Sequence, residues 1–207
     1  MAASAKVFKK LADEKAPGPS PTFTPYHLIV AVELMAEKSL GRNKLAKELG
    51  VGEGAVRTLL DRLRYADLVD CSRNGCALSV KGNRVWKEYS SVMRKVKIGK
   101  NDLTACKHSY AALIKGSGEK VRSGIEQRDA AIVMGAKSVT TIIFKNGKLV
   151  IPSVSPNLEK DFPEVAGQIT KSLQPAENDV IVVAGADDKL KAEYSVLAAT
   201  WTLINQD

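Results

Sequence analysis

The chain has 207 residues, 44% of them hydrophobic, and a formal net charge of +8. This is enough for one large core or two small ones. The sequence has no apolar run near the ~20 residues that cross a bilayer, and its first residues form no continuous apolar segment of signal-peptide length, so we expect a cytoplasmic protein with no membrane contact.

Positive charge is unevenly distributed along the chain. Residues 1–97 carry 18 lysines and arginines against 10 aspartates and glutamates, whereas residues 98–207 carry 13 of each kind. A basic proteome would raise the charge of both parts, so the asymmetry favours a first domain that binds a polyanion such as DNA.

Composition and charge divide the chain into three parts. Residues 1–22 contain three prolines close together, which predict a flexible arm whose lysines either touch DNA or stay solvated. We expect a DNA-binding domain over residues 23–97. Residues 98–207 then form a second domain.

A helix-turn-helix is predicted early in the first domain. Residues 24–38 predict a scaffold helix with Thr24 as N-cap and Pro25 at the first helical position. Residues 39–66 hold two short amphipathic helical patterns on either side of Gly50-Val51-Gly52, where a glycine can take the left-handed backbone conformation that ends a helix. Such a unit places its second helix in the major groove of DNA.

A hairpin pattern follows these helices. Residues 68–73 and 76–80 are strand-like runs joined by Asn74-Gly75, a strong signal for a two-residue turn centred on that pair. Residues 81–89 open another amphipathic helix. The resulting order of helix, helix, helix, hairpin, helix is that of a winged helix.

On this order, residues 24–95 resemble the winged-helix transcriptional regulators of bacteria and archaea. In those proteins a stretch like Leu78-Ser79-Val80-Lys81-Gly82 commonly leads out of the wing. The resemblance covers about a third of the chain and implies double-stranded DNA as partner and transcription regulation as role. Because winged helices also serve as protein-binding domains, an interaction module without sequence-specific DNA binding is the alternative.

Residues of the second helix outside its apolar stripe are candidates for DNA contact. Near the N-terminus of the helix, Arg57 and Thr58 are expected to read base edges. Arg62 and Arg64 lie about one turn further along and suit phosphates better. Arg42 and Lys44 could clamp the DNA backbone, and Arg73, beside the wing tip, could reach a phosphate or an adjacent minor groove. Each of these side chains could instead be an ordinary solvated charge.

The second domain alternates strand and helix patterns in the order strand, helix, strand, strand, helix, strand, helix. Residues 139–144 and 148–152 predict a second hairpin through Asn146-Gly147, and residues 180–184 a fully buried strand. The order contains the βαββαβ unit of a ferredoxin-like sandwich with an added C-terminal helix, although other α/β layerings share it. We therefore expect a two-domain α/β protein in which a winged helix-turn-helix precedes an α+β sandwich.

Two resemblances concern this second domain. Its layout resembles that of the Lrp/AsnC regulators, in which a sandwich domain dimerises and senses a metabolite. Residues 100–204, through the stretches at 124–131 and 178–183, are similar to uncharacterised archaeal proteins that pair a winged helix with a C-terminal domain of unknown function. The first resemblance implies a homodimer and a small-molecule effector, and the second implies no known chemistry.

Candidate effector residues lie on the helix predicted over residues 124–134. Arg128 could bind an acidic metabolite and Glu126 or Asp129 an amine, although solvated helix charges explain these residues as well. No paired base and nucleophile can be assembled from the sequence, so we expect neither an enzyme nor a cofactor.

The cysteines permit a test of a metal site. A turn centred on Asn74-Gly75 would leave Cys71 and Cys76 diagonal on one hairpin face, about 7 to 8 Å apart, which disfavours a disulfide. A zinc site would have to join them to Cys106 and His108 across two domains without any C-x-x-C spacing. We therefore expect no metal, and free thiols in a reducing cytoplasm.

The last predicted helix carries an apolar seam. Its members are Leu190, Tyr194, Leu197, Trp201 and Ile204. Such a seam either packs on the sheet of its own chain or pairs with a second copy. We expect a homodimer, with the position of its interface open.

Overall fold

The computed structural model describes residues 3–14 and 22–204. The chain divides into two compact units, Met1–Ser91 and Val92–Asp207, so the boundary falls before the one expected after residue 97. The two units carry 15 and 16 lysines and arginines against 10 and 13 aspartates and glutamates, giving net charges of +5 and +3. The expectation that all excess positive charge belongs to the first domain is therefore wrong.

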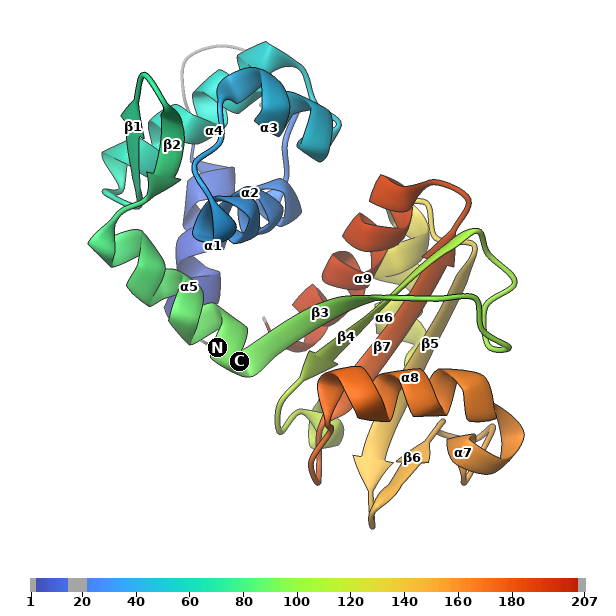
Figure 1. Ribbon diagram of the computed structural model, residues 1–207. Coiled ribbons are helices and arrows are strands. Elements are labelled where there is room, and N and C mark those ends of the chain that lie inside the picture. The colour runs from blue at the N-terminus through green and yellow to red at the C-terminus, as the bar shows by residue number, and fades with distance from the viewer. Residues whose placement is uncertain (1–2, 15–21, 205–207) are drawn as a thin grey trace. The chain divides into compact units, whose positions relative to one another are not determined.

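The first unit has the helix, helix, helix, hairpin, helix order predicted for residues 24–95, preceded by one further helix (Figure 1). Its elements are α1 (Ala3–Asp13), α2 (Pro25–Glu37), α3 (Arg42–Leu49), α4 (Glu53–Tyr65), β1 (Val69–Ser72), β2 (Gly75–Leu78) and α5 (Val80–Val92). Gly50 ends α3 in the left-handed conformation, with φ of 66°, as the turn of a helix-turn-helix requires. Leu45 of α3 and Leu59 of α4 are completely buried, which confirms the predicted apolar stripes.

Helix α1 corrects the prediction that residues 1–22 form a flexible arm. Residues 3–13 are helical, and Phe8 and Leu11 are buried in the core of the first unit. The Phe8 ring meets the Tyr89 ring of α5 edge to face, with 5.4 Å between centroids. An isolated helix of this length is marginal in water, so this burial is what holds α1. The prolines on which the prediction rested lie outside the described residues.

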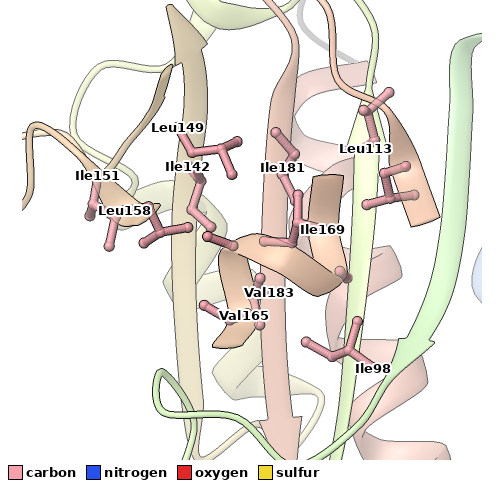
Figure 2. Packing of buried hydrophobic residues seen from close by; sticks show 13 residues of the cluster. Ile98, Leu113, Ile142, Leu149, Ile151, Leu158, Val165, Ile169, Ile181 and Val183 are labelled. Carbon is pink, nitrogen blue, oxygen red and sulfur yellow. The ribbon is translucent and has the colours of Figure 1, made fainter. Parts of the chain in front are cut away.

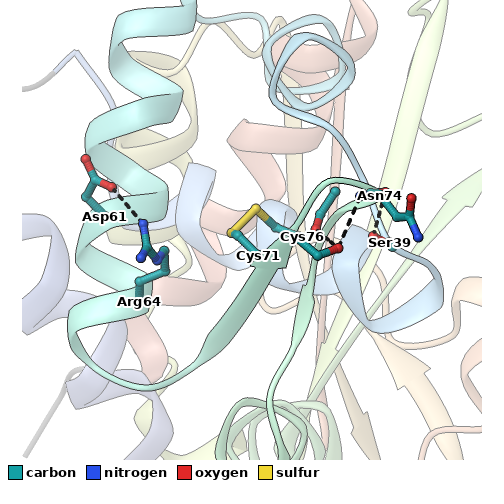
Figure 3. Close-up of a disulfide and its surroundings, with 8 residues drawn as sticks. Ser39, Asp61, Arg64, Cys71, Asn74 and Cys76 are labelled. Atoms are coloured by element: carbon teal, nitrogen blue, oxygen red, sulfur yellow. Dashed lines mark hydrogen bonds and ion pairs between the residues drawn. A yellow bond between two sulfur atoms is a disulfide. The ribbon is translucent and has the colours of Figure 1, made fainter.

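The hairpin β1–β2 differs from its predicted register. Cys71 pairs directly with Cys76 and Ser72 with Gly75, so the loop consists of Arg73 and Asn74. The two cysteines form a disulfide with 4.0 Å between their Cα atoms (Figure 3), and the expectation of free, diagonal thiols is wrong.

A contact from outside the hairpin accounts for the register. Leu40 exchanges two backbone hydrogen bonds with Cys76, both of 2.9 Å. Gly75 has φ of +115°, and a Cβ there would lie 2.8 Å from the backbone carbon of Leu40. Only glycine allows the chain before α3 to lie this close, so Gly75 is used as a strand residue.

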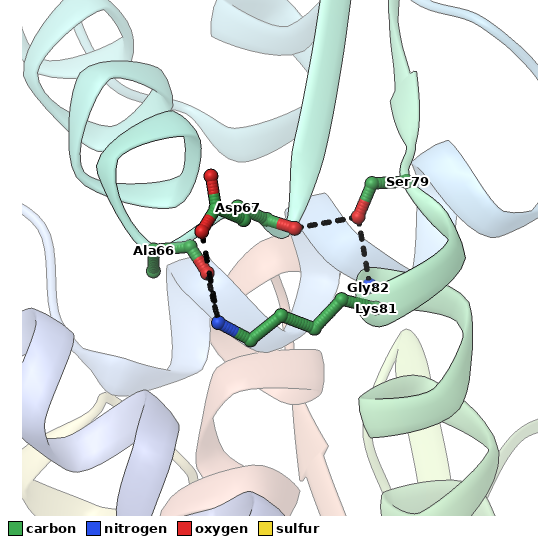
Figure 4. A network of polar contacts seen from close by, with 5 residues as sticks. All are labelled: Ala66, Asp67, Ser79, Lys81 and Gly82. Carbon is green, nitrogen blue, oxygen red and sulfur yellow. Dashed lines mark hydrogen bonds and ion pairs between the residues drawn. The ribbon is translucent and has the colours of Figure 1, made fainter.

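The stretch Ser79-Val80-Lys81-Gly82 joins the wing to α5 through a polar network (Figure 4). Ser79 Oγ donates to the carbonyl of Asp67 at 2.6 Å and accepts from the N–H of Gly82 at 3.0 Å. Lys81 Nζ donates to the carbonyl of Ala66 at 2.8 Å. A Cβ on Gly82 would lie 2.0 Å from the carbonyl oxygen of Leu68. The serine thus caps α5, and the glycine permits close approach of the helix to the backbone of Leu68, just before β1.

The second unit is built on one five-stranded antiparallel sheet. Its elements are β3 (Met93–Ile98), β4 (His108–Ile114), the 3-10 turn η1 (Gly118–Lys120), α6 (Ile125–Val133), β5 (Ser138–Lys145), β6 (Lys148–Val150), α7 (Leu158–Asp161), α8 (Pro163–Leu173), β7 (Val180–Ala186) and α9 (Lys189–Ile204). The strand order is β3-β4-β7-β5-β6, with all neighbours antiparallel. Helix α8 covers one face, and α6 and α9 cover the other (Figure 1).

This arrangement corrects the ferredoxin-like prediction. Within the predicted βαββαβ series, β7 and β5, the fourth and second strands, are central, whereas a ferredoxin-like sandwich places its first and third strands there. The structure also has three layers and an additional edge strand, β3, that the sequence did not predict. Patterning along a chain indicates most of the elements that form, but it does not specify their order across a sheet.

The core on the α8 face draws on all five strands of the sheet and on α7 and α8 (Figure 2). Ile169 of α8 packs with Leu113 of β4, Ile142 of β5 and Ile181 of β7, all at most 1% exposed. Every residue of β7 is buried, as predicted for a strand covered on both faces.

The apolar seam of α9 packs within its own chain. Helix α9 contacts β4 and β7, and Tyr194, Leu197 and Ile204 are at most 6% exposed. The sequence left open whether this seam packs on the sheet of its own chain or pairs with a second copy. The structure shows packing on the chain's own sheet. Within the described residues, no helix combines the length and the apolar character needed to span a membrane.

Candidate nucleic-acid interface

Helix α4 separates its residues into a buried face and an exposed face. Val56 and Leu59 are completely buried, whereas Arg57, Thr58 and Arg64 are exposed. The helix begins at Glu53 after Gly52, which has extended backbone geometry and makes no side-chain cap. The side chains predicted to reach DNA from the exposed face are therefore open to solvent.

A basic hollow lies between α3, α4 and the wing. It has a volume of about 430 Å³. Four of the predicted DNA contacts line it: Arg42, Arg57, Arg64 and Arg73. Asp61 is the one acidic residue among the lining residues, and its carboxylate lies 3.8 Å from Arg64 Nη1 (Figure 3). Because the side chains of this pair are about 60% exposed, the pair is worth at most ~1 kcal/mol and leaves Arg64 able to exchange partners.

One hydrogen bond and one disulfide hold the wing in shape beside the hollow. Ser39 Oγ donates to the carbonyl of Asn74 at the wing tip, at 3.1 Å (Figure 3). The Cys71–Cys76 disulfide links the two strands and itself lines the hollow. The disulfide stiffens the wing, and the Ser39 bond ties its tip, with Arg73 next to Asn74, to the segment that precedes α3.

Arg62 does not belong to this surface, which corrects its prediction as a phosphate contact. Its side chain is 7% exposed. It donates to the carbonyls of Leu11 at 2.7 Å, Ala12 at 2.9 Å and Glu14 at 2.6 Å, and its guanidinium lies 5.1 Å from the centre of the Phe23 ring. Arg62 thus satisfies the last carbonyls of α1 and complements the negative end of its dipole.

The remaining predicted contacts are exposed but lie outside the hollow. Lys44 is exposed on α3 and is not a lining residue. Thr58 is exposed, and its hydroxyl donates to the carbonyl of Gly54 at 3.2 Å. Neither side chain therefore belongs to the group of four arginines that line the hollow.

Eight of the twelve residues that line the hollow were not predicted as part of the site, and three of them, Asp61, Cys71 and Cys76, bear on its chemistry. Asp61 could have been found, because its spacing of three residues from Arg64 on a helix predicts an ion pair. Cys71 and Cys76 could not, because their pairing depends on the contact with Leu40. With these two cysteines in a disulfide, the zinc hypothesis that joined them to Cys106 and His108 loses two of its ligands. Among the residues that the structure describes, no group of three or more His, Cys, Asp or Glu could hold a metal ion.

The predicted effector residues lie on α6 of the second unit. Arg128 donates from Nε at 3.1 Å and from Nη2 at 3.0 Å to the same carboxylate oxygen of Asp129, and both side chains are more than half exposed. Arg128 lines a pocket of about 250 Å³, whereas Asp129 is not among its lining residues. The two candidates therefore do not converge on one site.

Comparison with known proteins finds matches to two family models. The model described as PH0730-like, N-terminal domain matches residues 27–84, and the one described as Domain of unknown function (DUF4443) matches residues 105–203. No curated protein matches the chain.

Two solved structures are similar to the chain. Hypothetical protein PH0730 from Pyrococcus horikoshii OT3 is 27% identical over 86% of this chain and 91% of its own, with a TM-score of 0.72. Wild-type Lactococcus lactis ZitR is 26% identical over 38% of this chain and 58% of its own, with a TM-score of 0.31. The chain thus resembles a hypothetical archaeal protein along most of its length, while residues 27–84 and 105–203 each match the model of an uncharacterised domain.

Proposed function

We propose that the chain is a transcription regulator whose first unit binds double-stranded DNA, with α4 in the major groove and the wing against the adjacent backbone. The observation that carries the proposal is the convergence of four arginines, from α3, α4 and the wing, on one open hollow. Arginine pairs bidentately with phosphate and with guanine. The net charge of +5 on the first unit supports the same partner.

The position of each arginine suggests which part of the DNA it contacts. Arg57, near the start of α4, reads base edges. Arg42, Arg64 and Arg73 contact phosphates and set the register of the helix. In this proposal the protein acts by binding alone, without a catalytic step or a cofactor.

We propose that the protein works as a homodimer in the cytoplasm and that its second unit supplies the dimer contact or senses a small molecule. A regulator that reads a two-fold operator needs two copies of its reading helix. Light scattering of the purified chain measures the mass directly, and a monomer at micromolar concentration would remove this part of the proposal.

The test is the salt dependence of binding to a pool of duplex DNA. Each phosphate contact contributes about −0.9 to the slope of log K against log salt, so three arginines on phosphates predict a slope of about −3. Arg73→Ala should make the slope shallower by about one. Arg84→Ala is the matched control, because Arg84 is an exposed arginine of α5 that does not line the hollow.

A protein partner is the competing function. Weak DNA binding that does not change with salt would favour the protein-interaction module and would overturn the DNA proposal. An equal loss of slope in the Arg84→Ala variant would show that net charge, and not the hollow, determines binding.

A further inference from the structure

The second unit contains a pocket that none of the contacts proposed for DNA uses. It has a volume of about 250 Å³ and lies where α6 begins beside β5. Its polar lining comes from Ser123, Gly124, Arg128, Thr140 and Thr141. Its apolar lining includes Leu103, Ile151, Val154 and Phe162. The pocket is thus polar near the start of α6 and apolar elsewhere.

One polar group in this pocket has no partner of its own. Thr141 is 7% exposed, and its Oγ1 is buried without a hydrogen-bond partner among the described residues. This oxygen lies 3.2 Å from the position that a Cβ on Gly124 would occupy, so the hydroxyl is directly beside the residue that precedes α6. Buried hydroxyls are nearly always hydrogen-bonded, and an unpartnered one in a pocket lining points to a ligand.

The start of α6 adds positive potential at the same place. Gly124, with φ of 77°, precedes the helix and makes no side-chain cap. The first turn of an α-helix carries N–H groups without intrahelical acceptors and about half a positive charge. Arg128, one turn into α6, contributes a full positive charge to the pocket, and its ion pair with Asp129 is exposed and exchangeable.

The edge of β5 contributes a third feature. Strand β5 pairs with β7 from Ser138 to Ile143 but with β6 only from Ile143 to Lys145. Among the described residues, the side of Ser138–Ile142 that faces away from β7 therefore has no strand partner. Val139, Thr140 and Thr141 on this edge line the pocket, so backbone donors and acceptors also border it.

We propose that this pocket binds a small carboxylate with an aliphatic tail. The carboxylate would accept hydrogen bonds from Thr141 Oγ1 and from Arg128 at the start of α6, and the tail would lie against Ile151, Val154 and Phe162. The volume suits a molecule of about the size of an amino acid or a short acid and is below the usual range for larger ligands. Binding of the carboxylate does not depend on the proposed regulatory function. Only the role of this ligand as an effector rests on that proposal.

The experiment uses the full chain without DNA and titrates it with 3-methylbutanoate while recording amide NMR spectra. We expect saturable shifts at Gly124, Ile125 and Thr141, with a Kd on the order of millimolar for so small a ligand. The neutral analogue 3-methylbutanamide should bind about tenfold more weakly, because it carries no charge for Arg128 and the helix start to stabilise.

Two variants and a control locate the binding. Thr141→Val keeps the shape and removes the hydroxyl, and Arg128→Gln removes the charge; each should raise the Kd about tenfold. Because the hydroxyl has no partner in the protein, Thr141→Val should melt at or above the temperature of the parent, which separates loss of binding from loss of folding. Arg122→Gln, which removes an exposed arginine outside the lining, should stay within about twofold of the parent.

The outcomes separate the inference from the DNA proposal. Saturable binding that the two variants weaken supports the site even if the chain fails to bind DNA. No saturable shift at these amides up to about 50 mM, equal binding of the amide analogue, or unchanged binding by both variants would overturn it. Equal shifts with inorganic phosphate, which has no tail, would likewise overturn the assigned ligand class.

Discussion

Arg62 and Arg64 lie two residues apart on α4 but have different surroundings. Arg62 is buried against α1, where three backbone carbonyls accept its hydrogen bonds. Arg64 is exposed and lines the basic hollow beside the wing. Two residues turn an α-helix by about 200°, so the two side chains leave on opposite sides. The comparison teaches that a basic residue on an amphipathic helix is available to a partner only where the side chain is not already bound within its own unit.

The strongest test of this contrast is the stability of arginine variants. Arg62→Ala should lower the free energy of unfolding of the first unit by about 3 kcal/mol, because a buried charged donor and three bonds to the end of α1 are lost. Arg64→Ala should change it by less than about 0.5 kcal/mol. Urea denaturation followed by circular dichroism measures both. Equal losses would contradict the division of α4 into a structural and a DNA-binding face.

His27 extends the comparison to a second buried basic residue. The backbone N–H of Thr24 donates to His27 Nδ1 at 3.0 Å, which requires a neutral ring, and burial lowers the pKa of His27 from 6.5 to about 4. The unfolded chain therefore binds a proton between pH 6.5 and pH 4 that the folded chain does not. The stabilisation is complete above pH 6.5 and is lost as the pH falls toward 4.

This difference predicts acid sensitivity of the first unit. Between pH 7 and pH 4.5 its free energy of unfolding should fall by about 2 kcal/mol because of His27 alone. His27→Gln, which keeps an acceptor for the Thr24 N–H, should be less sensitive to pH by that amount. Thermal denaturation of parent and variant over this pH range measures the difference. Identical pH profiles of the two proteins would show that His27 is not the group responsible.

The exposed arginines should differ from each other in what they recognise. Arg57→Ala should weaken binding to the preferred DNA sequence about tenfold, or ~1.4 kcal/mol, and should reduce discrimination among sequences, because a base contact is lost. Arg64→Ala should weaken all sequences alike. Competition binding with a degenerate duplex library distinguishes the two, and loss of discrimination with Arg64→Ala instead would reverse the assigned roles.

Lys44 should give the smallest effect. It is exposed on α3 but outside the hollow, so Lys44→Ala should cost at most ~1 kcal/mol of DNA affinity at low salt and nothing in sequence preference. Titration at two salt concentrations measures this. A loss larger than that of Arg57→Ala would place the DNA contact on α3 and away from the hollow.

The two Asn-Gly pairs show where sequence patterns succeed and fail. Asn146 and Gly147 have φ of 53° and 70° and form the predicted two-residue turn, with Lys145 paired to Lys148. At the wing, Gly75 alone has positive φ, and the loop moves back by one residue to Arg73 and Asn74. The local preference is the same in both places. Only the wing has an outside segment, at Leu40, that bonds to Cys76 and sets the register.

The candidate site divides in the same way. The exposure of Arg57, Thr58 and Arg64 follows from the 3.6-residue period of α4, which the sequence shows directly. The burial of Arg62 does not follow from this period, because its partner is α1. Helix α1 is held in place by packing, which the local sequence pattern did not predict. Thr141 is also beyond sequence reasoning, since a threonine in a strand gives no sign of whether its hydroxyl has a partner.

By itself, the amino-acid sequence determined which segments become helices and strands from α2 to α5 of the first unit, the glycine turn at Gly50, and the two-residue turn at Asn146-Gly147, because periodicity and backbone angles act over a few neighbours. The tertiary structure alone decided the strand order of the second unit, the Cys71–Cys76 pairing and the burial of Arg62. Each of these depends on segments far apart in the chain, whose contacts are set by packing and backbone hydrogen bonds that local propensity cannot specify.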